Sequence, residues 1–159
     1  MLVKSYSPEH LDELILNMFL EAMRVREEKS NFEAVYEKDI DLLIVEEFQV
    51  SEDFREWFLQ QVNEEIQGFD GAWRSVTKYN GESDIEIAYT DDKEDKTLLL
   101  VEDKIKEKQQ PNQAERYQKR GQYYTENTEA DRFTTMIIAP EQYLNENIRE
   151  KYDHALTYE

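Results

Sequence analysis

Two carboxylates and one amine lie on neighbouring segments that we expect to form strands. Glu102 and Lys104 stand two residues apart near the end of the segment 97–106. In an extended chain they point to the same face, about 6.8 Å apart. Asp84 lies opposite Glu102 if the hairpin between the two segments folds about Lys93. Cross-strand neighbours have Cβ atoms about 4.5–5.5 Å apart, which lets two carboxylates bind one divalent cation.

Such a pair of carboxylates needs positive charge beside it. Two like charges about 4 Å apart repel by roughly 4 kcal/mol at an effective dielectric of about 20. Lys104 can offset part of this repulsion, and a hard cation such as Mg²⁺ or Mn²⁺ can offset the rest. These groups together have the parts required for phosphodiester hydrolysis. We therefore predict Asp84, Glu102 and Lys104 as catalytic residues, and the two acids also as metal ligands.

The spacing of apolar residues predicts the helices that must position these residues. The segment 7–22 has apolar residues at helical intervals, behind a serine and a proline that can open a helix. A second helix is expected over 37–48. A third begins at Ser51 and continues until Gly68 stops it.

After Gly68 the apolar period changes from that of a helix to that of a strand. We expect a short strand at 75–79, a turn at 80–81 and an alternating strand at 83–89. The strand from Thr97 is apolar on both faces at its start, which is typical of a covered central strand.

A further helix and strand complete the expected order. Asn112 can cap a helix, with Glu115 three residues later as its capping-box partner. A last buried strand spans 133–139. The order of helices, three strands, helix and strand indicates an α/β fold with a mixed central β-sheet flanked by helices.

The length of 159 residues indicates a single domain over 1–159. Its parts are a helical N-terminal region over 1–70 and a β-β-β-α-β core over 71–140. The tail 152–159 stops without a terminating signal, so we expect a further C-terminal element to be missing.

The composition limits the function classes. The formal net charge of −18 repels nucleic acid, so nucleic-acid binding needs a local basic patch or another subunit. The absence of cysteine excludes thiolate ligands, so any metal must be bound by oxygen or nitrogen. No run approaches the roughly 20 apolar residues that cross a bilayer, so we expect a cytoplasmic protein without membrane association.

The motif GESD at 81–84, followed by LLLVEDK at 98–104, resembles the PD-(D/E)xK nuclease superfamily. The stretch QAERY at 113–117 is similar to the QxxxY element of its RecB-like members. Ser83 stands where proline is often found. The resemblance implies a restriction-endonuclease-like fold, Mg²⁺ or Mn²⁺ as cofactor and nucleic acid, DNA first, as substrate.

The resemblance also implies roles for individual residues. Asp84 and Glu102 would bind the metal, Lys104 would assist catalysis, and the Asp103 carbonyl would be a further ligand. Gln113 and Tyr117 would line the site. Members often add a glutamate from an N-terminal helix, for which Glu37 and Glu47 are the candidates; we favour Glu37.

These residues also have ordinary structural interpretations. In an acidic chain, an acid-x-lysine triplet is common at a solvated strand end. Tyr117 is in phase with the apolar face of its helix, so it fits a core position as well as a site. Glu82 and Glu86 share the face of Asp84, and we expect both to be exposed.

Basic residues are densest just before and within the helix that Asn112 is expected to cap, close to the expected site. A solvated face and phosphate binding are both open for them, and we assign Arg116 to substrate binding. The group comprises Lys106, Lys108, Arg116, Lys119 and Arg120.

A second function remains open, because the charge favours it. The chain would then be a catalytically inactive acidic interaction module that binds a basic protein partner and imitates nucleic acid. In the nuclease interpretation, a protein partner or additional domain could supply the nucleic-acid-binding surface.

Overall fold

A computed structural model of the chain describes residues 36–79, 81–105 and 110–158. The helix expected at 7–22 lies outside these ranges. No helix in the described part is long and apolar enough to cross a membrane. The elements are α2 (Glu37–Val50), α3 (Glu52–Gln60), β1 (Ile66–Lys78), β2 (Gly81–Asp91), β3 (Lys96–Asp103), α4 (Gln113–Glu126), β4 (Arg132–Ala139), α5 (Glu146–Arg149) and β5 (His154–Thr157).

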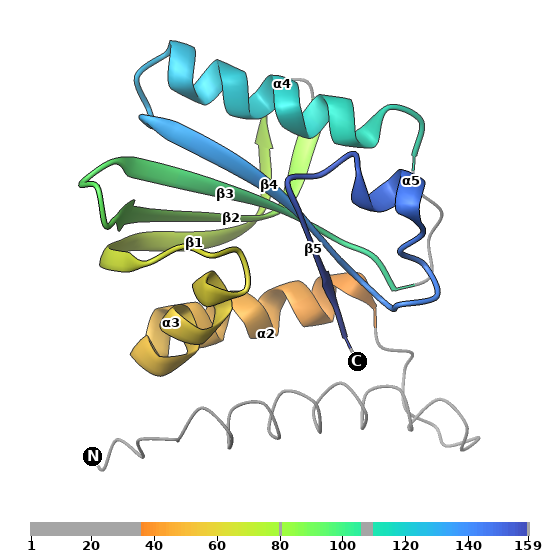
Figure 1. Ribbon diagram of the computed structural model, residues 1–159, viewed down its shortest axis with the longest axis horizontal. Coiled ribbons are helices and arrows are strands. Elements are labelled where there is room, and N and C mark those ends of the chain that lie inside the picture. The colour runs from red at the N-terminus through yellow and green to blue at the C-terminus, as the bar shows by residue number, and fades with distance from the viewer. Residues whose placement is uncertain (1–35, 80, 106–109, 159) are drawn as a thin grey trace.

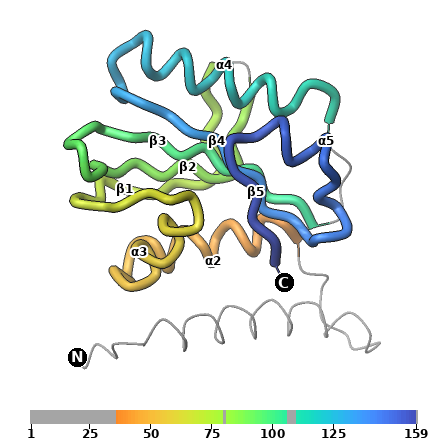
Figure 2. The backbone as a smooth tube through the Cα atoms, in the orientation of Figure 1, coloured from red at the N-terminus to blue at the C-terminus, as the bar shows by residue number. Residues whose placement is uncertain are grey.

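A five-stranded sheet forms the central layer, and helices cover both of its faces (Figure 1). Helices α2 and α3 lie on one face, and α4 lies on the other. Strands β1, β2 and β3 pair antiparallel, whereas β3, β4 and β5 run parallel. Figure 2 shows β5 beside β4, at the edge opposite β1. The expected α/β fold with a mixed sheet flanked by helices is therefore confirmed.

Side chains alternate along β2 and β3 and so divide the interior into two cores. On the side of α2 and α3, Ile85 of β2 and Leu99 of β3 are fully buried. On the side of α4, Leu98 and Leu100 of β3 are buried with Tyr117 of the helix. The successive polar residues at the end of β3 must therefore face α4 and α2 alternately.

Helix α3 begins as expected but is shorter. The Ser51 hydroxyl accepts a hydrogen bond from a backbone N–H in its first turn. Asn63, at a φ of 56°, follows the helix, and the Glu64 N–H donates to the Leu59 carbonyl at 3.0 Å. Asparagine tolerates this left-handed conformation, which ends the helical turn well before Gly68.

Strand β1 consequently starts earlier than the sequence predicted. Ile66, which falls within the expected third helix, instead pairs with Asp91 of β2. The expected strand at 75–79 is only the end of β1. The predicted boundary between residues 70 and 71 was wrong as a division between helices and sheet, because it falls within β1.

The start of α4 also differs in its chemistry. Asn112 is the residue before the helix, but its φ of 57° is left-handed and its side chain makes no capping hydrogen bond. The Gln113 side-chain oxygen accepts from the Gln110 N–H at 3.0 Å instead. The predicted capping box between Asn112 and Glu115 was therefore wrong.

The tail forms a strand that the sequence did not predict. β4 matches the expected strand at 133–139, but it is not the last one, because β5 pairs parallel with its second half. The four residues of β5 are too few to show an alternating pattern. Pairing with the buried β4 is what holds them extended.

The contact between α4 and β4 gives a test of how α4 is held. A Cβ added at Gly121 would lie 2.0 Å from a ring atom of Phe133. Alanine usually stabilises a helix relative to glycine, so the steric clash decides the sign. We expect Gly121→Ala to lower the free energy of unfolding by about 1–3 kcal/mol, measured by urea denaturation.

Gly68→Ala is the matched control. The nearest atom to its added Cβ is 3.6 Å away, which is ordinary van der Waals contact. We expect a change below about 0.5 kcal/mol. Equal midpoints for Gly121→Ala and the wild type would contradict the tight packing of α4 on β4.

Candidate active site

The hairpin between β2 and β3 has the register that the sequence argument assumed. Ile85 pairs with Val101 and Thr90 with Lys96, so the hairpin is centred on Lys93. The pairing ends at Ile85 and Val101, so Asp84 and Glu102 are the next residues of the two strands. The Asp103 N–H donates to Asp84 Oδ2 at 2.9 Å, which joins the two strands at this end.

Glu102 is held by two neighbours on the α4 side of the sheet. Its side chain is only 1% exposed. Lys104 Nζ lies 2.7 Å from Glu102 Oε1, and the Gln113 amide donates to the same oxygen. Among the described residues, the buried Oε2 has no hydrogen-bond partner. One carboxylate oxygen is therefore fixed while the other remains available to a ligand.

The first residue of α2 reaches the same place. Glu37 Oε1 accepts from the Ile105 N–H at 2.8 Å, and its Oε2 lies 3.5 Å from Lys104 Nζ. Glu47 stands ten residues further along the helix, about 15 Å along its axis. Of the two candidate glutamates, the structure brings Glu37 beside Lys104.

Two more carboxyl groups join this cluster from the α2 side. Asp103 is fully buried, and both of its side-chain oxygens lack a hydrogen-bond partner among the described residues. Asp41 is 3% exposed, and its Oδ1 is likewise unpaired in the described part of the chain. Sequence reasoning missed Asp41, although its position one turn after Glu37 places both on one helix face.

Burial and mutual repulsion shift the acidity of this cluster. Burial, followed by the charge of Glu102, raises the pKa of Asp84 to about 8. Burial and the charge of Glu37 raise the pKa of Asp41 to about 7. Burial and the charge of Asp41 raise the pKa of Asp103 well above its usual value.

Lys104 responds in the opposite sense to its surroundings. Burial lowers its pKa, but the charge of Glu102 and the hydrogen bond to it raise the pKa more, so the net shift is upward. The ammonium group thus stays charged. Among the described residues, five carboxyl groups interact electrostatically with it, those of Glu37, Asp41, Asp84, Glu102 and Asp103.

Tyr117 serves both the core and the site. It is 1% exposed, and its hydroxyl accepts from the Asp84 N–H at 3.1 Å and donates to the Val101 carbonyl at 3.2 Å. It therefore ties α4 to both strands next to the two acids. Gln113, one turn earlier, contacts Glu102 directly.

Arg116 lies on another side of α4. Its guanidinium donates to the Pro111 carbonyl at 2.6 Å and to the Gln110 side chain at 3.0 Å. These bonds fasten the loop before the helix. The structure thus gives Arg116 a local structural contact in place of one with the acids.

Glu86 and Arg120 are buried, contrary to expectation. Glu86 is 3% exposed, and it accepts hydrogen bonds from Ser83 and Tyr124 at 2.7 Å each. Arg120 is 1% exposed and donates to the Ser83 hydroxyl at 2.8 Å. Burial raises the pKa of Glu86. The predicted exposure of Glu86 and the surface position of Arg120 were wrong, because these groups satisfy one another beneath α4.

Glu82 and the lysines of the basic group have different positions in the structure. Glu82 is exposed as expected, and Lys119 is exposed on α4. Lys106 and Lys108 lie outside the described residues. The buried network beside Asp84 therefore anchors β2 to α4, whereas Lys119 remains accessible.

The cluster is not arranged as a finished metal cage. Within residues 36–79, 81–105 and 110–158, no three or more histidine, aspartate or glutamate side chains converge as metal ligands. Glu102 Oε1 is directed to Lys104 and Gln113, and Asp84 Oδ2 to a backbone N–H. Cation binding would require small side-chain rotations at these residues.

Comparisons of the chain with models of protein families, with curated proteins and with solved structures gave no match. The function must therefore be argued from the geometry and chemistry of the cluster.

The raised pKa of Asp84 predicts a pH dependence of stability. Between the unperturbed value of 3.8 and about 8, the folded state holds a proton that the unfolded state has lost. Stability is therefore lost as the pH rises through this window. Asp84→Asn removes this titration. The free energy of unfolding of the variant, relative to that of the wild type, should therefore increase by at least about 1 kcal/mol from pH 5 to pH 8 in EDTA.

Chemical denaturation at the two pH values measures this difference. Asp92→Asn, at an exposed residue of the β2–β3 hairpin, is the control and should show the same difference from wild type at both. A pH-independent difference for Asp84→Asn would contradict the burial of a protonated Asp84.

Proposed function

We propose that this protein hydrolyses phosphodiester bonds in nucleic acid, DNA first, with the help of a divalent cation. The observation that carries the proposal is the juxtaposition of Asp84, Glu102 and Lys104 where β2 and β3 meet. The acids come from adjacent strands, and the ammonium lies 2.7 Å from Glu102. A metal-dependent nuclease needs this combination of oxygen ligands and a cationic group.

The order of elements supports a restriction-endonuclease-like fold. Helices α2 and α3 precede three antiparallel strands, and α4 then crosses over to the parallel strand β4. This order agrees with the resemblance of the motifs to the PD-(D/E)xK nucleases. Tyr117 and Gln113 of the QxxxY-like stretch both face the two acids, which the resemblance also leads us to expect.

The residues present fit a hard cation. Glu102 Oε2 and both Asp103 carboxylate oxygens are buried without a partner in the described part of the chain, and Mg²⁺ and Mn²⁺ prefer oxygen ligands. Asp84 and Glu102 would hold the cation, with the Asp103 carbonyl and Glu37 supplying further oxygens. A bound cation would polarise the phosphate and lower the pKa of a water molecule.

Lys104, Gln113 and Tyr117 would each have a separate role in the reaction. Lys104 keeps its proton and can stabilise the negative charge that develops on the phosphate. Gln113 fixes the orientation of the Glu102 carboxylate by donating to one of its oxygens. Tyr117 fixes the backbone on both sides of the acids. These last two are positioning residues.

A second function is favoured by the net charge of −18 and by the absence of a finished cage in the described residues. In it, the protein is an inactive acidic module that binds a basic protein. It predicts a tight complex with such a partner, no bound divalent cation and no cleavage.

Cleavage assays on the full chain decide between these functions. We expect labelled DNA to be cleaved with Mg²⁺ or Mn²⁺ and left intact with EDTA. Lys104→Ala should reduce the rate about 100-fold or more, because it removes a group that acts on developing charge. Lys93→Ala, at an exposed residue of the distant hairpin, should cleave like the wild type.

A second variant separates catalysis from folding. Lys104→Ala leaves the buried Glu102 carboxylate without the ammonium group beside it, which destabilises the protein. Lys104→Arg keeps the charge but changes its geometry, so we expect a folded protein with impaired cleavage. No cleavage by the wild type of any single- or double-stranded DNA or RNA, with either metal, would contradict the proposed function.

A further inference from the structure

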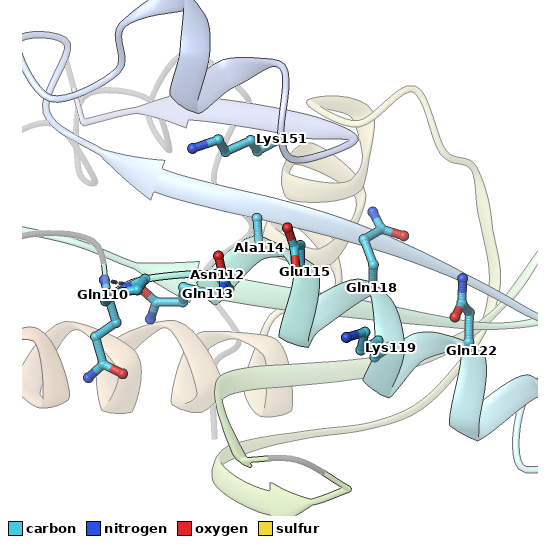
Figure 3. Close-up of a pocket in the computed structure, with 10 residues that line it drawn as sticks. Gln110, Asn112, Gln113, Ala114, Glu115, Gln118, Lys119, Gln122 and Lys151 are labelled. Atoms are coloured by element: carbon cyan, nitrogen blue, oxygen red, sulfur yellow. Dashed lines mark hydrogen bonds between the residues drawn. The ribbon is translucent and has the colours of Figure 1, made fainter.

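A pocket of about 660 Å³ lies along the N-terminal half of α4, outside the cluster of acids (Figure 3). Lys151, from the segment between α5 and β5, lies over the first turn of α4, on the side of Ala114 in this view. In the part of the chain that the structure describes, four glutamines and Asn112 supply amide side chains to its lining. A volume of this size is within the range of about 300–1,000 Å³ that is typical of sites for compact ligands.

The charge of the pocket is unlike that of the whole chain. Among the described residues that line it, Lys119 and Lys151 stand with a single acid, Glu115, whereas the chain has a formal net charge of −18. Both lysines are exposed. The pocket is therefore a local place where an anionic ligand meets positive charge and neutral hydrogen-bonding groups.

Two of its amides are held in fixed orientations. The Gln118 amide donates to Thr135 Oγ1 at 3.1 Å and to Asp153 Oδ2 at 3.3 Å. The Gln113 oxygen accepts from the Gln110 N–H at 3.0 Å. Amides with fixed orientation lose less conformational entropy when a ligand binds.

Gln113 connects the pocket to the cluster of acids. It lines the pocket, and its amide nitrogen donates to Glu102 Oε1. A ligand in the pocket thus lies one side chain from the residues proposed to act on a phosphodiester bond.

We propose that this pocket binds a single-stranded segment of the nucleic-acid substrate, with Lys119 and Lys151 contacting phosphates and the amides contacting bases. The proposal rests on the proposed function. Amide side chains both donate and accept hydrogen bonds, as base edges do. Those edges are freely accessible in unpaired strands, and the limited volume suits a few nucleotides better than a duplex.

Fluorescence anisotropy with the full chain tests the proposal. The probe is a fluorescein-labelled 12-nucleotide single-stranded DNA, titrated in EDTA so that it stays intact. We expect the double variant Lys119→Ala/Lys151→Ala to bind at least about tenfold more weakly. Because two phosphate contacts are lost, the slope of log K against log salt should fall by about 1.4.

The matched control removes two lysines at the other end of the sheet. Lys93→Ala/Lys96→Ala changes the net charge by the same amount at exposed residues of the β2–β3 hairpin. It should bind within about twofold of the wild type. Equal losses in both double variants would show a general charge effect and overturn the proposal.

Further outcomes separate this proposal from the proposed function. Cleavage by the wild type decides the proposed function, whereas the metal-free binding comparison decides the pocket. Three results would overturn the pocket proposal. They are no binding by the wild type, equal affinity in the wild type and Lys119→Ala/Lys151→Ala, and equal affinity of the wild type for duplex and single-stranded DNA. A selective loss in that variant supports it, whether or not cleavage is found.

Discussion

An excess of buried negative charge at the end of β3 is the constraint on which the site depends. Carboxyl groups from α2, β2 and β3 gather around one ammonium group, that of Lys104. Removing a carboxylate from water costs several kcal/mol unless a partner compensates for it. The protein must therefore keep some of these groups protonated or bind a cation, and the raised pKa values of Asp41 and Asp84 express the first solution.

The rest of the fold holds this unfavourable arrangement in place. Tyr117 links α4 to β2 and β3, and the buried network of Ser83, Glu86 and Arg120 fastens β2 beside Asp84. On the other face, α2 is held over an aromatic core and presents its first residue to the site. Clusters of unfavourable charge persist where the surrounding packing determines them, and such places are frequently functional.

Local patterns predicted the parts of the site that lie on β2 and β3. Alternation and the hairpin centre were sufficient to predict the register of β2 on β3, since strand register follows from these two features. Asp41 and Arg120 were not predicted in their places, because burial of a charged residue depends on contacts between distant segments. The short strand β5 and the early end of α3 were missed because pairing with β4 and one left-handed asparagine decide them.

On the proposed function, the carboxyl cluster exchanges protons for a divalent cation. Calorimetric titration of Mn²⁺ into the full chain at pH 7, repeated in two buffers of different ionisation enthalpy, measures both events together. We expect binding with net proton release, because Asp84, with a pKa of about 8, must ionise to become a ligand. In Asp84→Asn, both the binding and the proton release should be lost. Absence of binding, or binding that releases no protons and survives Asp84→Asn, would contradict the proposed exchange.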